Sequence, residues 1–228
     1  MNNENMTDYS KIGQNISAQE ILLSKTYKLL AWSFVPCAVG ALAGMFVNPF
    51  MMISNYWIAV IVFFAFFYGM CFLIEKNRYS NTGAILLMVF TFGMGLMMAP
   101  LLAYAAHING GKLVAVAAAM TAAIFFAMSA MARRAHINTH AMGKFLTIGA
   151  IVIMTGVVAN LFLKMSVLSL ALSGLFVIFS SLIIMWQVRH VIDGGEDSHI
   201  SAALTIFIAI YNLFTSLLRI LIALSGED

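Results

Sequence analysis

Charged residues are scarce in this chain. Only 9% of its residues are Asp, Glu, Lys or Arg, and 62% are hydrophobic, whereas a soluble domain carries about 25% charged residues. A soluble fold of this composition would lack polar surface, so its solvent must be lipid. The 228 residues suffice for about six to eight spans of about 20 residues each, with short loops. This leaves no room for a soluble catalytic domain.

Cysteines, catalytic motifs and titratable residues inside apolar segments are also scarce. The two cysteines, Cys37 and Cys71, both lie in apolar blocks and cannot form a disulfide framework. The sequence has no Gly-x-Ser-Gly motif and no glycine-rich phosphate loop. Ionisable residues, which usually mark functional sites within a membrane, are almost absent from the apolar blocks. We therefore predict no enzymatic activity, no catalytic residue and no cofactor.

The five histidines fall in loops or at the ends of apolar blocks. His136 and His140 have the i, i+4 spacing of a helical metal site, but neither a Glu nor a third ligand accompanies them. We therefore predict no metal site. The net charge of +3 is small, and the basic residues lie between the apolar blocks. This pattern indicates membrane topology and not nucleic-acid binding.

Seven apolar blocks, each about long enough to cross a bilayer, follow a polar segment. This segment is residues 1–26, with Glu4, Asp8, Lys11 and Glu20 among its polar side chains. We predict a disordered cytosolic tail with a short amphipathic helix at 17–23, followed by a membrane domain over 27–224. The spans are expected at 27–47, 52–74, 82–106, 113–132, 145–163, 165–187 and 200–222. The predicted fold class is an all-α membrane protein with seven transmembrane helices.

Basic residues gather on one side of the membrane in this topology. With the N-terminus inside, nine Lys and Arg residues lie in inner segments and three in outer segments. The positive-inside rule then places the N-terminus in the cytoplasm and the C-terminus outside.

Small residues predict where the helices approach one another, because helices in lipid associate through close packing. The candidate seams are Gly40 with Gly44 in the first span, Ala115, Ala119, Ala123 and Ala127 in the fourth, and Gly149 with Gly156 in the fifth. Each seam would pack either two helices of one chain or two copies of the chain. The sequence does not separate these alternatives, so the oligomeric state stays open.

Two charged features lie near the ends of the last spans. Arg219 lies about 20 residues into the seventh span, near its outer end. We interpret it as an anchor whose side chain snorkels to the membrane interface. Asp193, Glu196 and Asp197 surround a double glycine in the loop before that span. Three acids could attract a cation, but in a flexible turn they are expected to face water.

Three stretches of the sequence resemble a known family of membrane proteins. They are Gly156-Val157-Val158-Ala159-Asn160-Leu161-Phe162-Leu163, the loop Ile192-Asp193-Gly194-Gly195-Glu196-Asp197, and Ile210-Tyr211-Asn212-Leu213-Phe214-Thr215-Ser216-Leu217-Leu218-Arg219-Ile220-Leu221 in the last span. Together they resemble the Bax inhibitor-1 family, and within it the bacterial YccA-like branch, from about residue 21 to the end. The resemblance implies a fold of six helices in hairpins around a central seventh.

The resemblance also implies a function that depends on protein–protein interaction. Members of this branch modulate FtsH, an ATP-dependent membrane protease, by acting as tightly folded and slowly degraded substrates. The chain would then lie in the bacterial inner membrane, with lipid and an FtsH-like protease as its partners. Residues 1–26 would be the segment that the protease engages.

A calcium or proton-linked ion leak is the alternative that the family implies. Relatives that form such a leak carry paired aspartates at the cytosolic end of the sixth span and in the middle of the seventh. The matching positions here are Gln187 and Ala209, which cannot titrate, so the proton switch is missing. The other polar positions, Asn160, Tyr211 and Asn212, are as easily explained by hydrogen bonds between helices. A transporter would favour an internal repeat, and we detect none.

Overall fold

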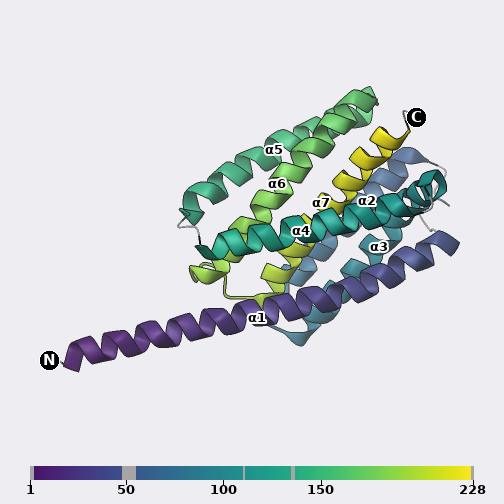
Figure 1. Ribbon diagram of the computed structural model, residues 1–228. Helices are drawn as coiled ribbons and strands as arrows, with labels where there is room; N and C mark the ends of the chain where they lie inside the picture. Colours follow the sequence, from purple (N-terminus) through teal and green to yellow (C-terminus); the bar gives the residue numbers. More distant parts are fainter. Residues whose placement is uncertain (1–2, 48–54, 110, 135–136, 227–228) are drawn as a thin grey trace.

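Seven long helices make up the computed structural model, which describes residues 3–47, 55–109, 111–134 and 137–226 (Figure 1). The helices are α1 (Asn3–Phe46), α2 (Tyr56–Lys76), α3 (Asn81–Asn109), α4 (Lys112–Arg134), α5 (Thr139–Leu163), α6 (Ser166–Ile192) and α7 (His199–Ser225). All seven are long and apolar enough to cross a membrane, and the described residues contain no strand. The predicted number of spans and the all-α fold class are confirmed.

The seventh helix lies at the centre of the bundle. It packs against α1, α2, α3, α4 and α6, and most residues from Ile200 to Leu218 are buried. By contrast, α5 lies at the periphery and packs along α6. The expectation of helices surrounding a central seventh therefore holds, with α5 as the outermost of them.

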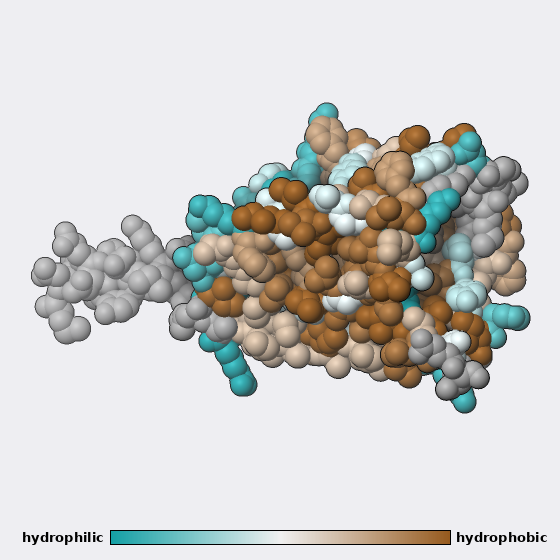
Figure 2. Space-filling view, turned by 90° about the horizontal axis from the view of Figure 1, so that it is seen from above, coloured by the Kyte–Doolittle hydropathy of each residue, from teal (hydrophilic) through white to brown (hydrophobic). Residues whose placement is uncertain are grey.

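The lateral surface of the bundle is apolar. Figure 2 shows a broad hydrophobic band with hydrophilic residues gathered mainly toward the two ends. Large side chains on this surface, such as Trp32, Phe72 and Ile148, are more than half exposed at 68%, 68% and 64%. Such exposure is stable only against lipid.

The first helix differs from the prediction. It is continuous from Asn3 to Phe46, and its apolar part begins at Ala18, so residues 3–26 are helical and not disordered. The segment contains a single glycine and no proline. Adding residues to an existing helix costs far less than nucleating one, so the span can propagate a polar extension. The start of α1 projects beyond the bundle (Figure 1). We call the end of the bundle where α1 joins it the basal end.

The glycines of α1 form a close seam with α3. A Cβ atom on Gly40 would overlap the carbonyl oxygen of Phe92, and one on Gly44 would lie 2.6 Å from the Cβ of Ala99. On α3, a Cβ on Gly95 would overlap the carbonyl oxygen of Cys37. The seam predicted at Gly40 and Gly44 is thus confirmed as packing within one chain.

Of the other two predicted seams, the one on α5 packs within the bundle and the one on α4 does not. Gly149 and Gly156 face α6, where added Cβ atoms would each lie 2.9 Å from Phe179 and Leu172 respectively. The alanine ladder on α4 is wrong as a seam within the bundle, because Ala115, Ala119, Ala123 and Ala127 are all exposed. The buried stripe of α4 is Leu113, Ala117, Thr121, Ser129 and Ala132.

Candidate functional site

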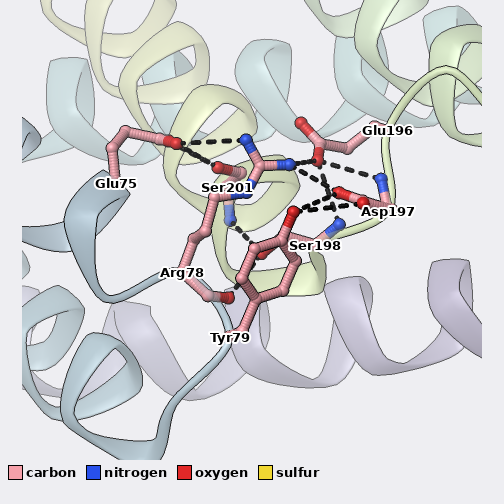
Figure 3. Close-up of polar contacts among 7 residues, drawn as sticks. All are labelled: Glu75, Arg78, Tyr79, Glu196, Asp197, Ser198 and Ser201. Carbon is pink, nitrogen blue, oxygen red and sulfur yellow. Dashed lines mark hydrogen bonds and ion pairs between the residues drawn. The ribbon is translucent and has the colours of Figure 1, made fainter.

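Two loops that are far apart in the sequence meet at the basal end of the bundle. The turn between α2 and α3 contributes Arg78 and Tyr79, and the loop between α6 and α7 contributes Glu196, Asp197 and Ser198 (Figure 3). Adjacent helical turns add Glu75 from α2 and Ser201 from α7. We call these seven residues the polar cluster.

Glycine and serine residues shape the two loops. The turn after α2 lies directly on the start of α3, since a Cβ on Gly83 would overlap the carbonyl oxygen of Asn77. After α6, Gly194 adopts a φ of 75°, a conformation that a side chain disfavours. Ser198 then caps α7, because its Oγ accepts from the Ser201 N–H at 3.2 Å. These local contacts therefore fix the backbone conformation of both loops.

Arg78 is the centre of the polar cluster. Its Nη2 donates to Glu196 Oε1 at 2.5 Å and to Asp197 Oδ1 at 2.6 Å. Its Nη1 lies 3.5 Å from Glu75 Oε2. The guanidinium also lies over the Tyr79 ring, 5.1 Å from its centroid. One side chain thus joins α2, the α2–α3 turn and the α6–α7 loop.

Further hydrogen bonds hold the backbone of the two loops together. Ser198 Oγ donates to the Arg78 carbonyl at 2.6 Å. Ser201 Oγ contacts both Glu75 carboxylate oxygens, at 2.5 and 2.6 Å. Glu196 Oε1 accepts from the N–H groups of Asp197 and Ser198, both at 3.0 Å. Because Glu196 is only 13% exposed, its carboxylate depends on these donors and on Arg78.

The electrostatics of the polar cluster favour the ionised form of Asp197. A hydrogen bond from the Tyr79 hydroxyl lowers the pKa of Asp197, and Arg78 lowers it further. The same hydrogen bond raises the pKa of Tyr79. Three carboxylates, Glu75, Glu196 and Asp197, surround one guanidinium. Within the described part of the chain, however, no group of three or more His, Cys, Asp or Glu side chains is arranged to hold a metal ion.

The sequence analysis predicted that the loop acids face water, but each of them also forms an ion pair. Asp193 pairs with Arg189 at 2.8 Å, while Glu196 and Asp197 pair with Arg78. The expectation was wrong because Arg78 lies 118 residues before Glu196. The available signal was that the topology places both loops on the same side of the membrane, with opposite charges. For the same reason, the sequence prediction did not include the other five members of the polar cluster, which are Glu75, Arg78, Tyr79, Ser198 and Ser201.

The two positions matched to the leak-forming relatives lie in the core. Gln187 on α6 is 2% exposed and Ala209 on α7 is 1% exposed. The Gln187 Nε2 has no hydrogen-bond partner, and neither has the Oγ of Ser180, one heptad before it on α6. No acidic residue is among the buried residues that the structure describes. The core therefore offers polar side chains but no carboxylate.

The remaining predicted positions have separate surroundings. Asn160 Oδ1 accepts from the Met165 N–H at 3.1 Å and so closes the turn between α5 and α6. Tyr211 donates to the Met94 carbonyl at 3.2 Å, which ties α7 to α3, and Asn212 beside it is partly buried. Arg219 is exposed on α7, six residues before the helix ends at Ser225, so its role as an anchor stays a prediction.

The histidines and the tail complete this comparison. His107, His140, His190 and His199 lie in the end turns of helices. His136 lies outside the described residues. In the tail, Glu20 is exposed, whereas the side chains of Glu4, Asp8 and Lys11 lie outside what the structure describes.

We expect Arg78→Ala to destabilise the protein by about 2 kcal/mol, because it leaves the Glu196 carboxylate largely buried beside backbone donors alone. For a chain of this size, that loss lowers the melting temperature by about 4–8 °C. Thermal unfolding in detergent, followed by tryptophan fluorescence, measures the change. Arg78→Lys should recover part of the loss, since lysine keeps the charge but not the planar donor geometry. Arg134→Ala, an exposed arginine at the end of α4, is the control, and an equal melting temperature for both alanine variants would contradict the assignment.

A pH dependence follows from the lowered pKa of Asp197. Asp197 binds a proton less readily in the folded state than in the unfolded state. Ionised Asp197 therefore stabilises the fold at pH values above the unfolded pKa of about 3.9. This stabilisation is lost as the pH falls through the lower folded pKa. Wild type should therefore melt above Asp197→Asn at pH 7, and the two melting curves should converge as the pH falls below about 4. A constant difference over this range would show that Asp197 acts through shape and not through charge.

Residues 19–226 match the protein family described as "Inhibitor of apoptosis-promoting Bax1". An uncharacterized protein of Neisseria meningitidis serogroup B is 58% identical over 214 residues, which cover 92% of this chain and 94% of that protein. An uncharacterized protein of Pseudomonas aeruginosa is 35% identical and covers 91% of each chain. The "Modulator of FtsH protease YccA" of Escherichia coli K12 is 33% identical over 200 residues, 88% of this chain and 89% of that protein.

Proposed function

Because this chain belongs to the Bax inhibitor-1 family, we propose that it restrains an FtsH-like protease of the bacterial inner membrane as a tightly folded, slowly degraded substrate. The supporting comparison is the relative named as a modulator of FtsH, which matches 88% of the chain at 33% identity. A related sequence from E. coli O6:H1 is named an inner membrane protein. In this proposal the protein acts by interaction and carries no catalytic residue.

The polar extension of α1 is the proposed handle for the protease. Residues 3–17 precede the apolar part of α1, and the helix projects from the basal end of the bundle (Figure 1). The excess of nine basic residues over three supports a cytoplasmic basal end. A protease on the cytoplasmic face would then meet this extension first, with Glu4, Asp8, Lys11 and Glu20 as candidate contacts.

Packing of α1 explains why the bundle would resist extraction. A pull on the handle acts directly on α1, the helix whose Gly40 and Gly44 lie against the backbone of α3. Near the basal end, Gln19 of α1 also lies beside Gly194 in the α6–α7 loop, within 2.7 Å of an added Cβ. Extraction must therefore break the seam between α1 and α3, and must move each apolar span out of lipid.

Degradation in proteoliposomes tests the proposal. A purified FtsH-type protease is reconstituted with a fluorescent membrane substrate and an excess of this protein. Wild type should slow substrate degradation, and deletion of residues 2–17 should remove most of this inhibition because the handle is gone. Deletion of residues 226–228, at the other terminus, is the control and should inhibit as wild type does. Absence of inhibition by wild type would refute the function, whereas full inhibition by the N-terminal deletion would refute the handle alone.

An ion leak is the second candidate, and one observation favours it. The Gln187 amide and the Ser180 hydroxyl are buried without partners, and groups of this kind could line a polar path. Calcium would be the ligand only in this alternative. The lack of a buried acid in the described core favours the protease modulator.

A further inference from the structure

The outermost helix, α5, carries a cleft with a basic rim at the basal end. The cleft has a volume of about 470 Å³ and lies between α5 and α6. His140 and Lys144 of α5 and His190 of α6 line it. Among the described residues, Lys144 has no acidic partner, and no acid lines the cleft. The cleft therefore offers unpaired positive charge at the depth where the helices leave the membrane.

The walls of this cleft are held in place by contacts within the chain. Trp186 Nε1 donates to the Thr139 carbonyl at 2.9 Å, which ties α6 to the first turn of α5. The Trp186 ring stacks on His190, with centroids 4.9 Å apart. Gly143 lies opposite Trp186, so that an added Cβ would just contact the indole nitrogen at 3.4 Å. The cleft is thus built by packing and does not depend on mobile surface side chains.

A second, apolar cleft continues along the same face of α5. It has a volume of about 460 Å³ and lies between α5 and Tyr68 of α2. Its α5 residues include Ile151, Met154 and Val158, which follow Lys144 and Thr147 at intervals of three or four residues. Such residues share one helix face. The face is uncovered, with Ile151 63% exposed.

The length and polarity of this face match one phospholipid. From Lys144 to Met154 the helix rises by about 15 Å, which is half of a hydrocarbon core of about 30 Å. We propose that an anionic phospholipid of the basal leaflet binds here, with its phosphate near Lys144, His140 and His190. One acyl chain lies along Ile151 and Met154. Basic clefts between helices at a membrane surface favour anionic headgroups. The proposal does not depend on the protease function.

Native mass spectrometry of the purified protein tests this lipid site. We expect phosphatidylglycerol to bind in preference to phosphatidylcholine of the same chains. Lys144→Ala should weaken phosphatidylglycerol binding roughly fivefold. Lys28→Ala, an exposed lysine of α1 toward the same end, is the matched control and should bind as wild type does. Equal binding of the two lipids, or an unchanged Lys144→Ala variant, would overturn the proposal.

Photo-crosslinking in vesicles locates the acyl chain. Phosphatidylglycerol with a diazirine at the middle of one chain should label the α5 segment around Ile151 and Met154. The variant Thr147→Trp fills the face between the two clefts and should abolish the label. Displacement of the lipid by millimolar inorganic phosphate would identify an anion site without lipid selectivity. That result would overturn the proposal.

Discussion

Replacing Gly95 by leucine is expected to abolish the folded protein. Gly95 lies on α3 where the backbone of α1 passes closest: a Cβ would overlap the Cys37 carbonyl oxygen and lie 2.9 Å from the Ala41 nitrogen. Both atoms belong to a helical backbone, so no side-chain rotation can relieve the overlap. The two helices would have to separate along their whole seam, with loss of the Gly40 and Gly44 contacts. We expect destabilisation of roughly 4 kcal/mol or more.

The control for Gly95→Leu is the same substitution at a helix glycine that no neighbouring atom approaches. Gly69 on α2 is exposed, and nothing lies within 4 Å of its added Cβ. Gly69→Leu should fold, and its melting temperature should stay close to that of wild type. Size-exclusion chromatography and thermal unfolding in detergent measure both variants. A monodisperse Gly95→Leu protein of normal melting temperature would show that the α1–α3 seam can open without cost.

The sequence predicts some parts of this fold well because they depend on hydropathy alone. Each span must satisfy its own backbone in lipid, so apolar length places all seven helices without knowledge of contacts. Which face of a helix is buried is harder to predict. Gly40 and Gly44 were found because only glycine permits backbone contact, but alanine is equally stable against lipid. The ladder from Ala115 to Ala127 therefore faces outward.

The polar cluster could not be predicted from spacing in the sequence. Arg78 and Glu196 are 118 residues apart, and their contact exists because α2, α3, α6 and α7 meet at one end of the bundle. Local patterns indicate only that loop charges are solvated. Asn160 is the opposite case. It was grouped with the polar positions of the core, yet its side chain closes the turn to Met165.

Introducing two carboxylates into the core is expected to convert a silent protein into a calcium leak. Gln187 and Ala209 are buried on two helices that pack together, and they are the two positions that the family resemblance predicts to correspond to the paired aspartates of a leak. We expect no calcium flux from wild type in proteoliposomes between pH 6 and 8. Gln187→Asp/Ala209→Asp should leak, and its flux should rise with pH. Two carboxylates that share a buried site repel each other, so the pair carries both negative charges only at the higher end of this pH range.

The neutral variant Gln187→Asn/Ala209→Ser is the control, because it alters shape and polarity at both positions without adding charge. It should remain silent, and size-exclusion chromatography should show that both double variants stay folded. A leak in the neutral variant would mean that packing, and not charge, closes the path. A pH-dependent leak in wild type would contradict the loss of the switch and would favour the ion-leak function. Another group would then control the leak, and His190, whose ring stacks on that of Trp186, is the first residue to replace.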